Sequence, residues 1–265
     1  MIIDGKAIAK DILTEVAGRV ATLPQVPRLT VFTCAPNFET EKFLALKQKR
    51  AKEVGIAVTL VTLDATSTTE AVVAAIVSAV PQTDGIIVQL PFPAQVDATA
   101  ILSAVPASHD VDVLRYAGEE TDILPPVVGA IDAIAKHHQV VFAGQSVVVV
   151  GQGRLVGKPA VLYVATHGAV VTVLKKDSVN AAAAIAAADI LILGAGVPGL
   201  ITAAMVKPGV VVFDAGTTEE GGVLAGDAAA EVAERAALFT PVPGGIGPIT
   251  IAILLRNLLN LTSTH

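Results

Sequence analysis

The sequence predicts an α/β protein of two domains, and three observations support this class. Short runs rich in Val and Ile alternate along the whole chain with stretches of helical periodicity. These runs are apolar throughout, which is typical of parallel strands buried on both faces of a sheet. At 265 residues, with 53% hydrophobic but only 3% aromatic residues, the chain can bury two ordinary cores built mainly from Val, Ile, Leu and Ala.

The expected strands are short and are separated by segments long enough to hold a helix. In chain order they are Leu29–Thr33, Ala57–Leu63, Gly85–Leu90, Ser146–Val150, Val170–Leu174, Ile190–Leu193 and Val210–Asp214. Helices are expected over Ala130–His138 and Pro248–Leu261. An earlier helix is expected in "FETEKFLALKQKRAKEVGI", beginning at Glu39 or Thr40.

A proline pair in "DILPPVVG" (residues 122–129) interrupts this pattern, and a new helix follows it. We place a domain boundary there. Residues 1–125 then form a first domain and residues 126–245 a second. The last segment, residues 246–265, is expected to return to the first domain as a helix.

Composition narrows the function classes. A single cysteine, Cys34, excludes an internal disulfide framework and a zinc site built from cysteines, so the cytoplasm is the default location. The net charge of −6, with no Lys/Arg run flanked by aromatic residues, argues against a nucleic-acid partner. The mean hydropathy is high, at +0.68, but the apolar runs have the length of strands, so no membrane span is expected. The opening segment has no long apolar stretch typical of a signal peptide.

A glycine turn follows a buried strand in "VGQGRLVGKP" (residues 150–159), and a helix pattern follows the turn. This is the context of a Rossmann-type dinucleotide site, in which small residues let a pyrophosphate reach a helix N-terminus. The spacing is one residue longer than the usual fingerprint, so a plain strand-to-helix turn stays open as the alternative. The residues expected to contact the cofactor are Gly151, Gln152, Gly153, Arg154, Leu155, Val156 and Gly157.

Two lysines, Lys175 and Lys176, come directly after the next expected strand, Val170–Leu174, where an NAD-selective site usually places an acidic residue. A lysine pair suits a 2′-phosphate, which favours NADP, although NAD stays open. Asp177 weakens the charge argument, and an ordinary solvated lysine pair is the alternative.

Near the end of the chain, "TPVPGGIGPITIAILL" (residues 240–255) crowds prolines and glycines in front of an apolar helix pattern. Pro248 suits a first helical turn, where a missing N–H costs nothing. Glycines are needed where the backbone turns with positive φ or where another group approaches it closely. The segment alone leaves a ligand-binding loop and a tight turn without a ligand equally open.

Taken together, "DGIIVQLPFP" (residues 84–93), the glycine turn and the segment 240–255 resemble one family. They are similar to the bifunctional methylenetetrahydrofolate dehydrogenase/methenyltetrahydrofolate cyclohydrolases, and so is the opening "IIDGKAIAKDI". The likeness spans essentially the whole chain. It implies oxidation of 5,10-methylene-tetrahydrofolate by NADP, hydrolysis of the methenyl product to 10-formyl-tetrahydrofolate, a cleft between two domains, a homodimer and no metal.

The resemblance also implies site residues. Lys47 matches the lysine of the family's catalytic helix, Gln89 the glutamine that orients it, and Asp112 in "HDVDV" the aspartate that grips the pterin. Without the family match, Lys47 would be read as part of a basic solvated helix face and Asp112 as a turn cap. The residues expected at the folate are Phe43, Lys47, Val88, Gln89, Leu90, Asp112, Pro243, Gly244, Gly245 and Gly247, and Ile246 is expected at the cofactor.

Four departures from the family pattern leave alternatives open. Phe43 stands where the family has tyrosine, Val113 replaces a glycine, and Gln152 replaces a basic residue; "LPPVVGA" lacks the usual "PCTP". The leading hypothesis is an enzyme with both activities. A dehydrogenase with weak cyclohydrolase activity and a catalytically silent dinucleotide-binding scaffold are the alternatives.

Overall fold

The structure, a computed structural model, describes residues 1–36, 38–119, 121, 123–220 and 223–262. Its contacts divide the chain into two compact units. The three-stranded unit comprises Lys10–Arg115, Asp122–Pro126 and Ile251–His265. The five-stranded unit comprises Met1–Ala9, Tyr116–Thr121 and Val127–Thr250. Three helices have residues in both units: α1 (Gly5–Val20), α5 (Pro126–His137, by its first residue alone) and α8 (Ile246–Thr262).

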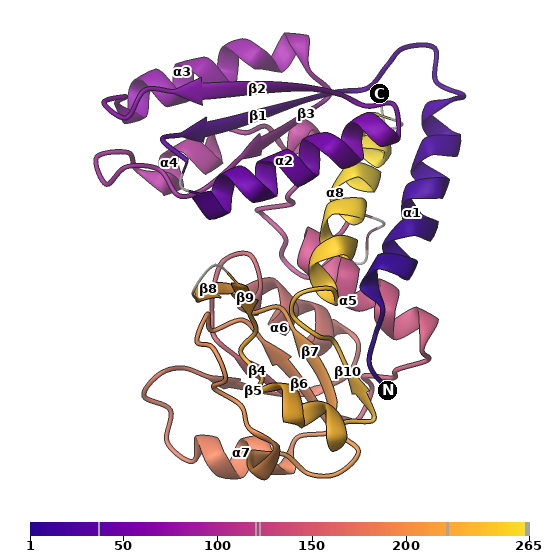
Figure 1. Ribbon diagram of the computed structural model, residues 1–265. Coiled ribbons are helices and arrows are strands. Elements are labelled where there is room, and N and C mark those ends of the chain that lie inside the picture. Colours follow the sequence, from indigo (N-terminus) through magenta and orange to yellow (C-terminus); the bar gives the residue numbers. More distant parts are fainter. Residues whose placement is uncertain (37, 120, 122, 221–222, 263–265) are drawn as a thin grey trace. The chain divides into compact units, whose positions relative to one another are not determined.

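The three-stranded unit is a parallel sheet with the strand order β2-β1-β3 (Figure 1). Its strands are β1 (Arg28–Cys34), β2 (Ala57–Leu63) and β3 (Gly85–Val88). Its helices are α2 (Phe38–Glu53), α3 (Thr69–Ala79) and α4 (Ala98–Ser103), with short 3₁₀ turns at Val80–Gln82 and Ala107–His109. A core of Phe32 and Ile86 from the strands and Ile76 and Ile101 from α3 and α4 joins these elements on one face.

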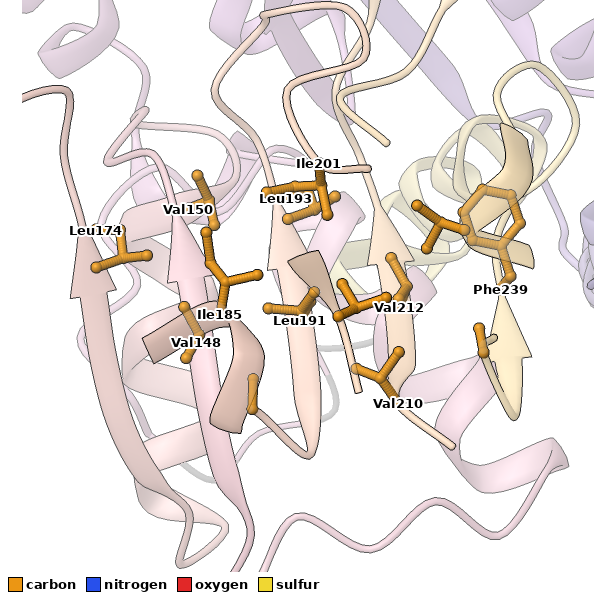
Figure 2. Close-up of a cluster of buried hydrophobic side chains, with 14 residues drawn as sticks. Val148, Val150, Leu174, Ile185, Leu191, Leu193, Ile201, Val210, Val212 and Phe239 are labelled. Carbon is orange, nitrogen blue, oxygen red and sulfur yellow. The ribbon is translucent and has the colours of Figure 1, made fainter. Parts of the chain in front are cut away.

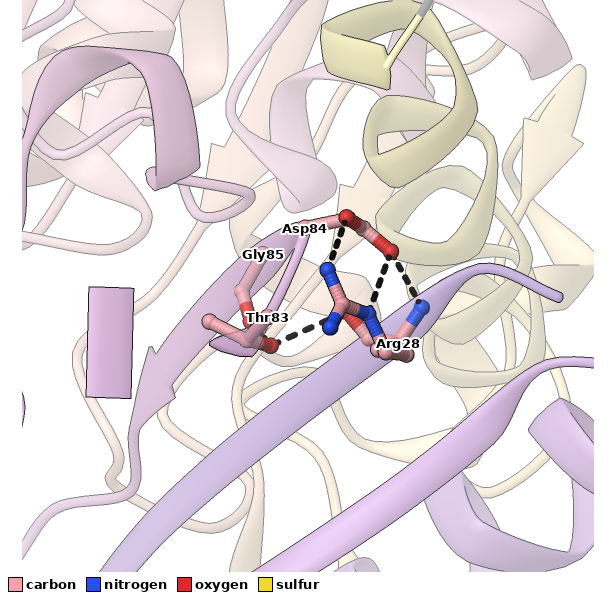
Figure 3. Close-up of polar contacts among 4 residues, drawn as sticks. All are labelled: Arg28, Thr83, Asp84 and Gly85. Carbon is pink, nitrogen blue, oxygen red and sulfur yellow. Dashed lines mark hydrogen bonds and ion pairs between the residues drawn. The ribbon is translucent and has the colours of Figure 1, made fainter. Parts of the chain in front are cut away.

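An ion pair ties β1 to β3 at the amino ends of these strands (Figure 3). The Arg28 guanidinium donates to both carboxylate oxygens of Asp84, at 3.3 Å from Nε and 3.0 Å from Nη2, and the Arg28 backbone N–H donates to the same carboxylate at 2.7 Å. Partial burial raises the pKa of Asp84, but the bonds from Arg28 outweigh it and hold this pKa below its usual value. The start of the sheet is therefore anchored at the end opposite to Gln89.

The five-stranded unit is a parallel sheet with the strand order β10-β7-β6-β4-β5. The strands are β4 (Ser146–Val150), β5 (Val170–Leu174), β6 (Ile190–Leu193), β7 (Val211–Asp214) and β10 (Leu238–Phe239); β8 (Thr218–Glu220) and β9 (Val223–Ala225) form a separate hairpin. The helices are α5 (Pro126–His137), α6 (Gly157–Thr166) and α7 (Ala181–Ala187), with 3₁₀ turns at Ala203–Met205 and Ala230–Glu234. The chain passes from β4 to β5 on one side and then to β6 on the other, so the topology switches at β4. Ligands of open α/β sheets bind at the carboxyl ends of the strands beside such a switch.

Rows of side chains across neighbouring strands build the core of this unit (Figure 2). Val148 on β4 lies beside Leu191 on β6, which lies beside Val212 on β7, and all three side chains are buried. Ile185 of α7 and Ile201 pack on the same cluster. This cluster contains one aromatic side chain, Phe239, and its other members reflect a composition that is rich in Val, Ile and Leu.

The structure confirms the α/β class and four strands to the residue, and it corrects other boundaries. The strands found as expected are Ala57–Leu63, Ser146–Val150, Val170–Leu174 and Ile190–Leu193. The first strand is Arg28–Cys34 rather than Leu29–Thr33, and the last begins at Val211 rather than Val210. The strand expected over Gly85–Leu90 ends at Val88, because Leu90 precedes Pro91, which has no N–H to extend a ladder.

Three helices begin earlier in the chain than the sequence pattern predicts. The helix expected from Glu39 or Thr40 begins at Phe38, and the one expected from Ala130 begins at Pro126. Proline fits the first helical position because its fixed φ suits the helix. The last helix begins at Ile246, which puts Pro248 within its first turn. Asp122 of the boundary motif and residues 263–265 of the last segment lie outside the described residues.

Among the described residues, no helix is long and apolar enough to cross a membrane.

Candidate active site

Lys47 and Gln89 form the centre of the candidate site, and both belong to the three-stranded unit. Lys47 lies in the middle of α2, and its Nζ donates to Gln89 Oε1 at 2.7 Å. Gln89 directly follows β3; its backbone N–H donates to Phe32 at 2.8 Å and its side-chain Nε2 to the Leu90 carbonyl at 3.1 Å. These contacts fix which end of the amide faces the lysine. The side chain of Val88 is buried, and that of Leu90 is partly buried.

Asp112 completes an electrostatic group with this lysine. Burial lowers the pKa of Lys47, and the negative charge of Asp112 partly opposes that effect. Burial raises the pKa of Asp112, and the charge of Lys47 partly opposes that rise. A lysine whose pKa moves toward neutrality can take up and release protons, which an ordinary surface lysine does poorly. The group is therefore suited to acid–base chemistry.

Phe43 lies one turn before Lys47 on α2, and its ring is partly buried. A phenyl ring has no hydroxyl to donate to or accept from the lysine, so position 43 contributes apolar surface to the surroundings of Lys47.

The loop that carries Asp112 is fastened from two directions. Asp110 is buried, and its Oδ2 accepts the backbone N–H of Leu114 at 2.7 Å. Asn257, a fully buried residue of α8, donates from Nδ2 to the carbonyls of Val111 at 3.0 Å and Leu124 at 2.8 Å. Burial raises the pKa of Asp110 to about 6, and the nearby charge of Asp112 adds to the effect. Asp112 is thus held on a short, braced loop.

Val113, the residue that replaces the family's glycine, has a φ of 52°. This is the left-handed region, which suits glycine and which costs other residues about 1 to 2 kcal/mol. Glycine would adopt this backbone conformation without strain, which is a local reason for glycine at this position. Val113 adopts it with backbone strain.

The glycine-rich segment before α8 belongs to the five-stranded unit. Gly244 has a φ of 110° and its carbonyl accepts the N–H of Gly5 at 3.0 Å. A Cβ on Gly245 would lie 2.7 Å from the Pro241 carbonyl oxygen. The backbone therefore requires glycine at positions 244 and 245 without any ligand. Gly247, by contrast, has open space around it.

The neighbours of these glycines differ in what they can offer a ligand. Pro243 is exposed, whereas the side chain of Ile246 is buried at 3% exposure. A ligand at Ile246 would therefore meet its backbone rather than its side chain.

The glycine turn after β4 is tightly folded on one side and open on the other. Gly151 has a φ of 96°, and its N–H donates to the Leu174 carbonyl of β5 at 2.9 Å. A Cβ on Gly157, the first residue of α6, would lie 2.1 Å from the Gly151 carbonyl oxygen. Gly153 has nothing within 4 Å of the position of its missing Cβ. A glycine with free space beside it, just before a helix N-terminus, lets a pyrophosphate approach the backbone N–H groups, so the turn fits a dinucleotide.

The remaining cofactor candidates surround this turn. The side chains of Gln152, Arg154 and Leu155 are exposed, and Val156 is partly buried against Gly194. Lys175 and Lys176 follow β5, the strand beside β4, and are exposed as well. The structure thus brings the two lysines to the same sheet edge as the turn, where they can meet a negatively charged ligand.

Several residues with polar roles were missed in the sequence. Asp110 lies in the quoted motif "HDVDV", and Asn257 interrupts an otherwise apolar helix. Asp214 is the last residue of the apolar strand β7, and Gln89 directly follows the apolar strand β3. The argument that a polar residue at the carboxyl end of a strand lies at a ligand site, which was applied to Gln89, could also have found Asp214. Asp227 lies in a loop with no such signal. Among the described residues, no group of three or more His, Cys, Asp or Glu side chains is placed to hold a metal ion.

Comparisons with known proteins give a consistent result over the whole chain. Residues 3–112 match the model of the tetrahydrofolate dehydrogenase/cyclohydrolase catalytic domain, and residues 125–265 match that of its NAD(P)-binding domain. The chain is 37% identical to the bifunctional protein FolD of Heliobacterium modesticaldum, covering 97% of this chain and 94% of the relative. It is 35% identical to that of Macrococcus caseolyticus, covering 97% and 96%.

Solved structures agree with this. The bifunctional FolD enzyme of Campylobacter jejuni superposes with a TM-score of 0.94 at 29% identity, covering 100% of this chain and 99% of the other. The Trypanosoma brucei dehydrogenase-cyclohydrolase, solved with NADP and an inhibitor, superposes with a TM-score of 0.93 at 32% identity, covering 100% and 97%.

Proposed function

The chain belongs to the tetrahydrofolate dehydrogenase/cyclohydrolase family, and from this membership we propose which of its residues carry the two reactions. It is a bifunctional methylenetetrahydrofolate dehydrogenase and methenyltetrahydrofolate cyclohydrolase of one-carbon metabolism, and it binds tetrahydrofolate derivatives and NADP. Lys47, Gln89 and Asp112 are the proposed catalytic group. The observation that carries this assignment is the 2.7 Å contact from Lys47 to Gln89, and the negative charge of Asp112 acts on the pKa of the same lysine.

In the first reaction, NADP held at the glycine turn would supply the acceptor for the hydride that leaves the one-carbon bridge of the substrate. The chain's contribution is positioning: Asp112 accepts hydrogen bonds from the pterin, and Phe43 and Leu90 supply apolar surface for flat rings. Gly247 leaves room for the folate at the start of α8. Pro243, Gly244 and Gly245 shape the approach to it.

The second reaction requires water to attack the methenyl carbon and a ring nitrogen to leave as the amine. Lys47, whose pKa is lowered by burial, takes a proton from the attacking water in its neutral form. It then gives that proton to the ring nitrogen as the C–N bond breaks, and the second proton of the water is released to solvent as the formyl C=O forms. Gln89 holds Nζ in place for both transfers.

Purified protein should show both activities in one spectrophotometric assay that follows NADPH and methenyl absorbance together. NADPH formation without any methenyl hydrolysis would contradict the role of Lys47. The silent-scaffold alternative does not apply to an enzyme of this family.

We also propose which ranges of the chain bind the folate and which bind the dinucleotide. Residues 1–125, with the helix in residues 246–265, bind folate, and residues 126–245 bind the dinucleotide. The matched ranges 3–112 and 125–265 support an early folate part and a late dinucleotide part. The cytoplasm is the proposed location, since the substrates are soluble metabolites.

A homodimer is proposed through the edge strand β2. This strand, "AVTLVTL", carries no charged residue and no proline, and Leu60 on it is 39% exposed. Sheets normally protect such an edge with charges or bulges, because its free N–H and C=O groups pair readily with another strand. Pairing of two β2 edges around a two-fold axis would cover it. Sedimentation velocity should show a dimer that Leu60→Lys weakens; a wild-type monomer at micromolar concentration would contradict the proposal.

NADP is expected to be preferred over NAD, but by less than in relatives with a basic residue at position 152. A charge-assisted contact to a phosphate contributes about 1.5 to 3 kcal/mol, so Lys176→Ala should reduce the NADP/NAD ratio of kcat/KM roughly tenfold or more. Steady-state kinetics with both coenzymes measures this, and Lys175→Ala shows which lysine dominates. A wild type that already favours NAD would contradict the assignment.

Phe43→Tyr should raise the cyclohydrolase rate relative to the dehydrogenase rate. The added hydroxyl would lie one turn from Lys47 and could hydrogen-bond to it, and proton transfer is sensitive to the pKa and orientation of the lysine. Measuring both activities in parallel for the two proteins gives the ratio. An unchanged ratio would mean that other groups around Lys47 replace the missing hydroxyl, and the weak-cyclohydrolase alternative would be dropped.

A further inference from the structure

A buried carboxylate lies directly beneath the loop that follows β6. Asp227 is 1% exposed, and its oxygens accept three successive backbone N–H groups of this loop. Oδ2 accepts from Ala195 at 2.6 Å and from Gly196 at 3.2 Å, and Oδ1 accepts from Val197 at 2.8 Å. Burying a carboxylate is costly unless such donors satisfy it, so the arrangement fixes the loop backbone in one form.

Further bonds hold the same loop against the segment that carries Asp227. Thr218 Oγ1 donates to the Gly196 carbonyl at 3.0 Å, and the Gly199 N–H donates to the Gly226 carbonyl at 3.1 Å. Asp227 is itself held by its neighbour, since its N–H donates to Asp214 Oδ1 at 3.2 Å.

No larger side chain fits at the two glycines that flank this carboxylate pair. A Cβ on Gly216 would lie 2.3 Å from the Asp227 carboxylate, and one on Gly226 would lie 2.3 Å from Asp214 Oδ2. The two carboxylates therefore form a closely fitted brace.

The braced loop lies where the topology places the dinucleotide. β6 is the neighbour of β4 across the switch point, and the Gly194 N–H donates to the Val150 carbonyl at 2.9 Å. A Cβ on Gly151 would lie 2.5 Å from the Gly194 carbonyl oxygen, so the loop directly adjoins the glycine turn. The loop and the turn therefore adjoin each other at the carboxyl ends of β4 and β6 within the five-stranded unit.

The loop turns its polar backbone groups inward and leaves its side chains outside. Ala195 and Gly196 are exposed, and Val197 is 47% exposed although it is apolar. Val197 is therefore an exposed apolar side chain on a hydrogen-bonded loop beside the glycine turn. It is suited to contact a ring or ribose of the cofactor.

We propose that Asp227 is a positioning residue for the dinucleotide: its carboxylate holds Ala195–Val197 in the form that adjoins the glycine turn, where the cofactor binds. Asp227 itself does not touch the cofactor, because the three N–H groups occupy its oxygens. The proposal rests on the dinucleotide binding assigned to the five-stranded unit and adds a residue to it that acts through the loop.

The test compares Asp227→Asn with Asp189→Asn by calorimetric titration with NADP and by steady-state kinetics. Asparagine at 227 keeps the shape but turns an N–H toward the loop, leaving at least one of the three donors unpaired. We expect NADP to bind about tenfold or more weakly, with KM for NADP raised, and KM for the folate and kcat at saturating NADP little changed.

Asp189 is a control carboxylate at the opposite end of β6, and its side chain is more exposed than that of Asp227, at 36%. Its Oδ2 also accepts a backbone N–H, from Ser146 at 2.8 Å, and its Oδ1 pairs with Lys207. Asp189→Asn should lower the melting temperature without weakening NADP binding. Unchanged NADP affinity in Asp227→Asn, or an equal loss in Asp189→Asn, would overturn the proposal.

Hydrogen exchange on the wild type gives a second test that needs no variant. The amides of Ala195, Gly196 and Val197 should be protected without ligand, and NADP should slow their exchange further. Rapid exchange without ligand, or no change on adding NADP, would overturn the proposal. If the wild type failed to bind NADP in the titration, the assigned dinucleotide binding would fail instead, so the two failures are distinguishable.

Discussion

Lys47→Met is expected to lower the cyclohydrolase rate by about 10²- to 10⁴-fold, the range typical for loss of a general acid–base group. Methionine keeps the length of the side chain and favours a helix, so α2 should persist. It removes the proton carrier and leaves Gln89 Oε1 without the lysine as its donor. Hydride transfer depends mainly on the positions of folate and NADP, so the dehydrogenase rate should fall less.

The control for this variant is Lys49→Met on the same helix, since Lys49 is exposed and the variant makes the same change of side chain. Both rates are measured from NADPH and methenyl absorbance, and circular dichroism checks the fold. A folded Lys47→Met protein with an undiminished cyclohydrolase rate, or an equal loss in Lys49→Met, would contradict the role of Lys47.

Gly157→Ala is expected to destabilise the five-stranded unit by about 3 kcal/mol and to abolish measurable NADP binding. The added methyl would lie 2.1 Å from the Gly151 carbonyl oxygen, which is backbone and cannot rotate away. Overpacking of this kind typically costs about 1 to 3 kcal/mol, and here relief requires the whole glycine turn to shift. Thermal melts and titration with NADP measure the two effects.

Gly153→Ala is the matched control in the same turn. It has open space for a methyl group, so its melting temperature should stay close to that of the wild type. Its NADP affinity should still fall, because the pyrophosphate is expected to approach the backbone there. A Gly157→Ala protein with wild-type stability would contradict the tight packing of the turn, and wild-type NADP affinity in Gly153→Ala would place the phosphates elsewhere.

Much of the fold could be predicted because buried parallel strands leave a strong local signal. The run "SVVVV" at Ser146–Val150 is apolar at nearly every position and is bounded by polar residues and glycine, so its ends were found to the residue. Helix starts such as Phe38 were harder, because their position depends on which backbone groups find partners. The two- and three-residue strands β8, β9 and β10 are too short to show any periodicity.

For the candidate site, the resemblance of the motifs to a known family indicated Lys47, Gln89 and Asp112, and the residue types are compatible with the chemistry that it implies. The pattern could not show that Lys47 bonds to Gln89, 42 positions away, or that burial shifts the pKa of both charged groups. Those properties depend on the dielectric surroundings and the distances that packing creates.

The glycines show the same division most clearly. The spacing in "VGQGRLVGKP" and "PVPGGIG" indicated that the backbone needs freedom there, and local residue preferences are enough for that inference. A side chain at Gly157 or Gly245 would collide with the backbone, whereas Gly153 and Gly247 have open space around them. This difference follows only from atoms that folding brings together. The brace formed by Asp214 and Asp227 could not be predicted for the same reason. Asp214 ends an apolar strand, but Asp227 lies in a loop without such a signal. Backbone N–H groups exist at every residue except proline, and only the tertiary fold aims three of them at the Asp227 carboxylate.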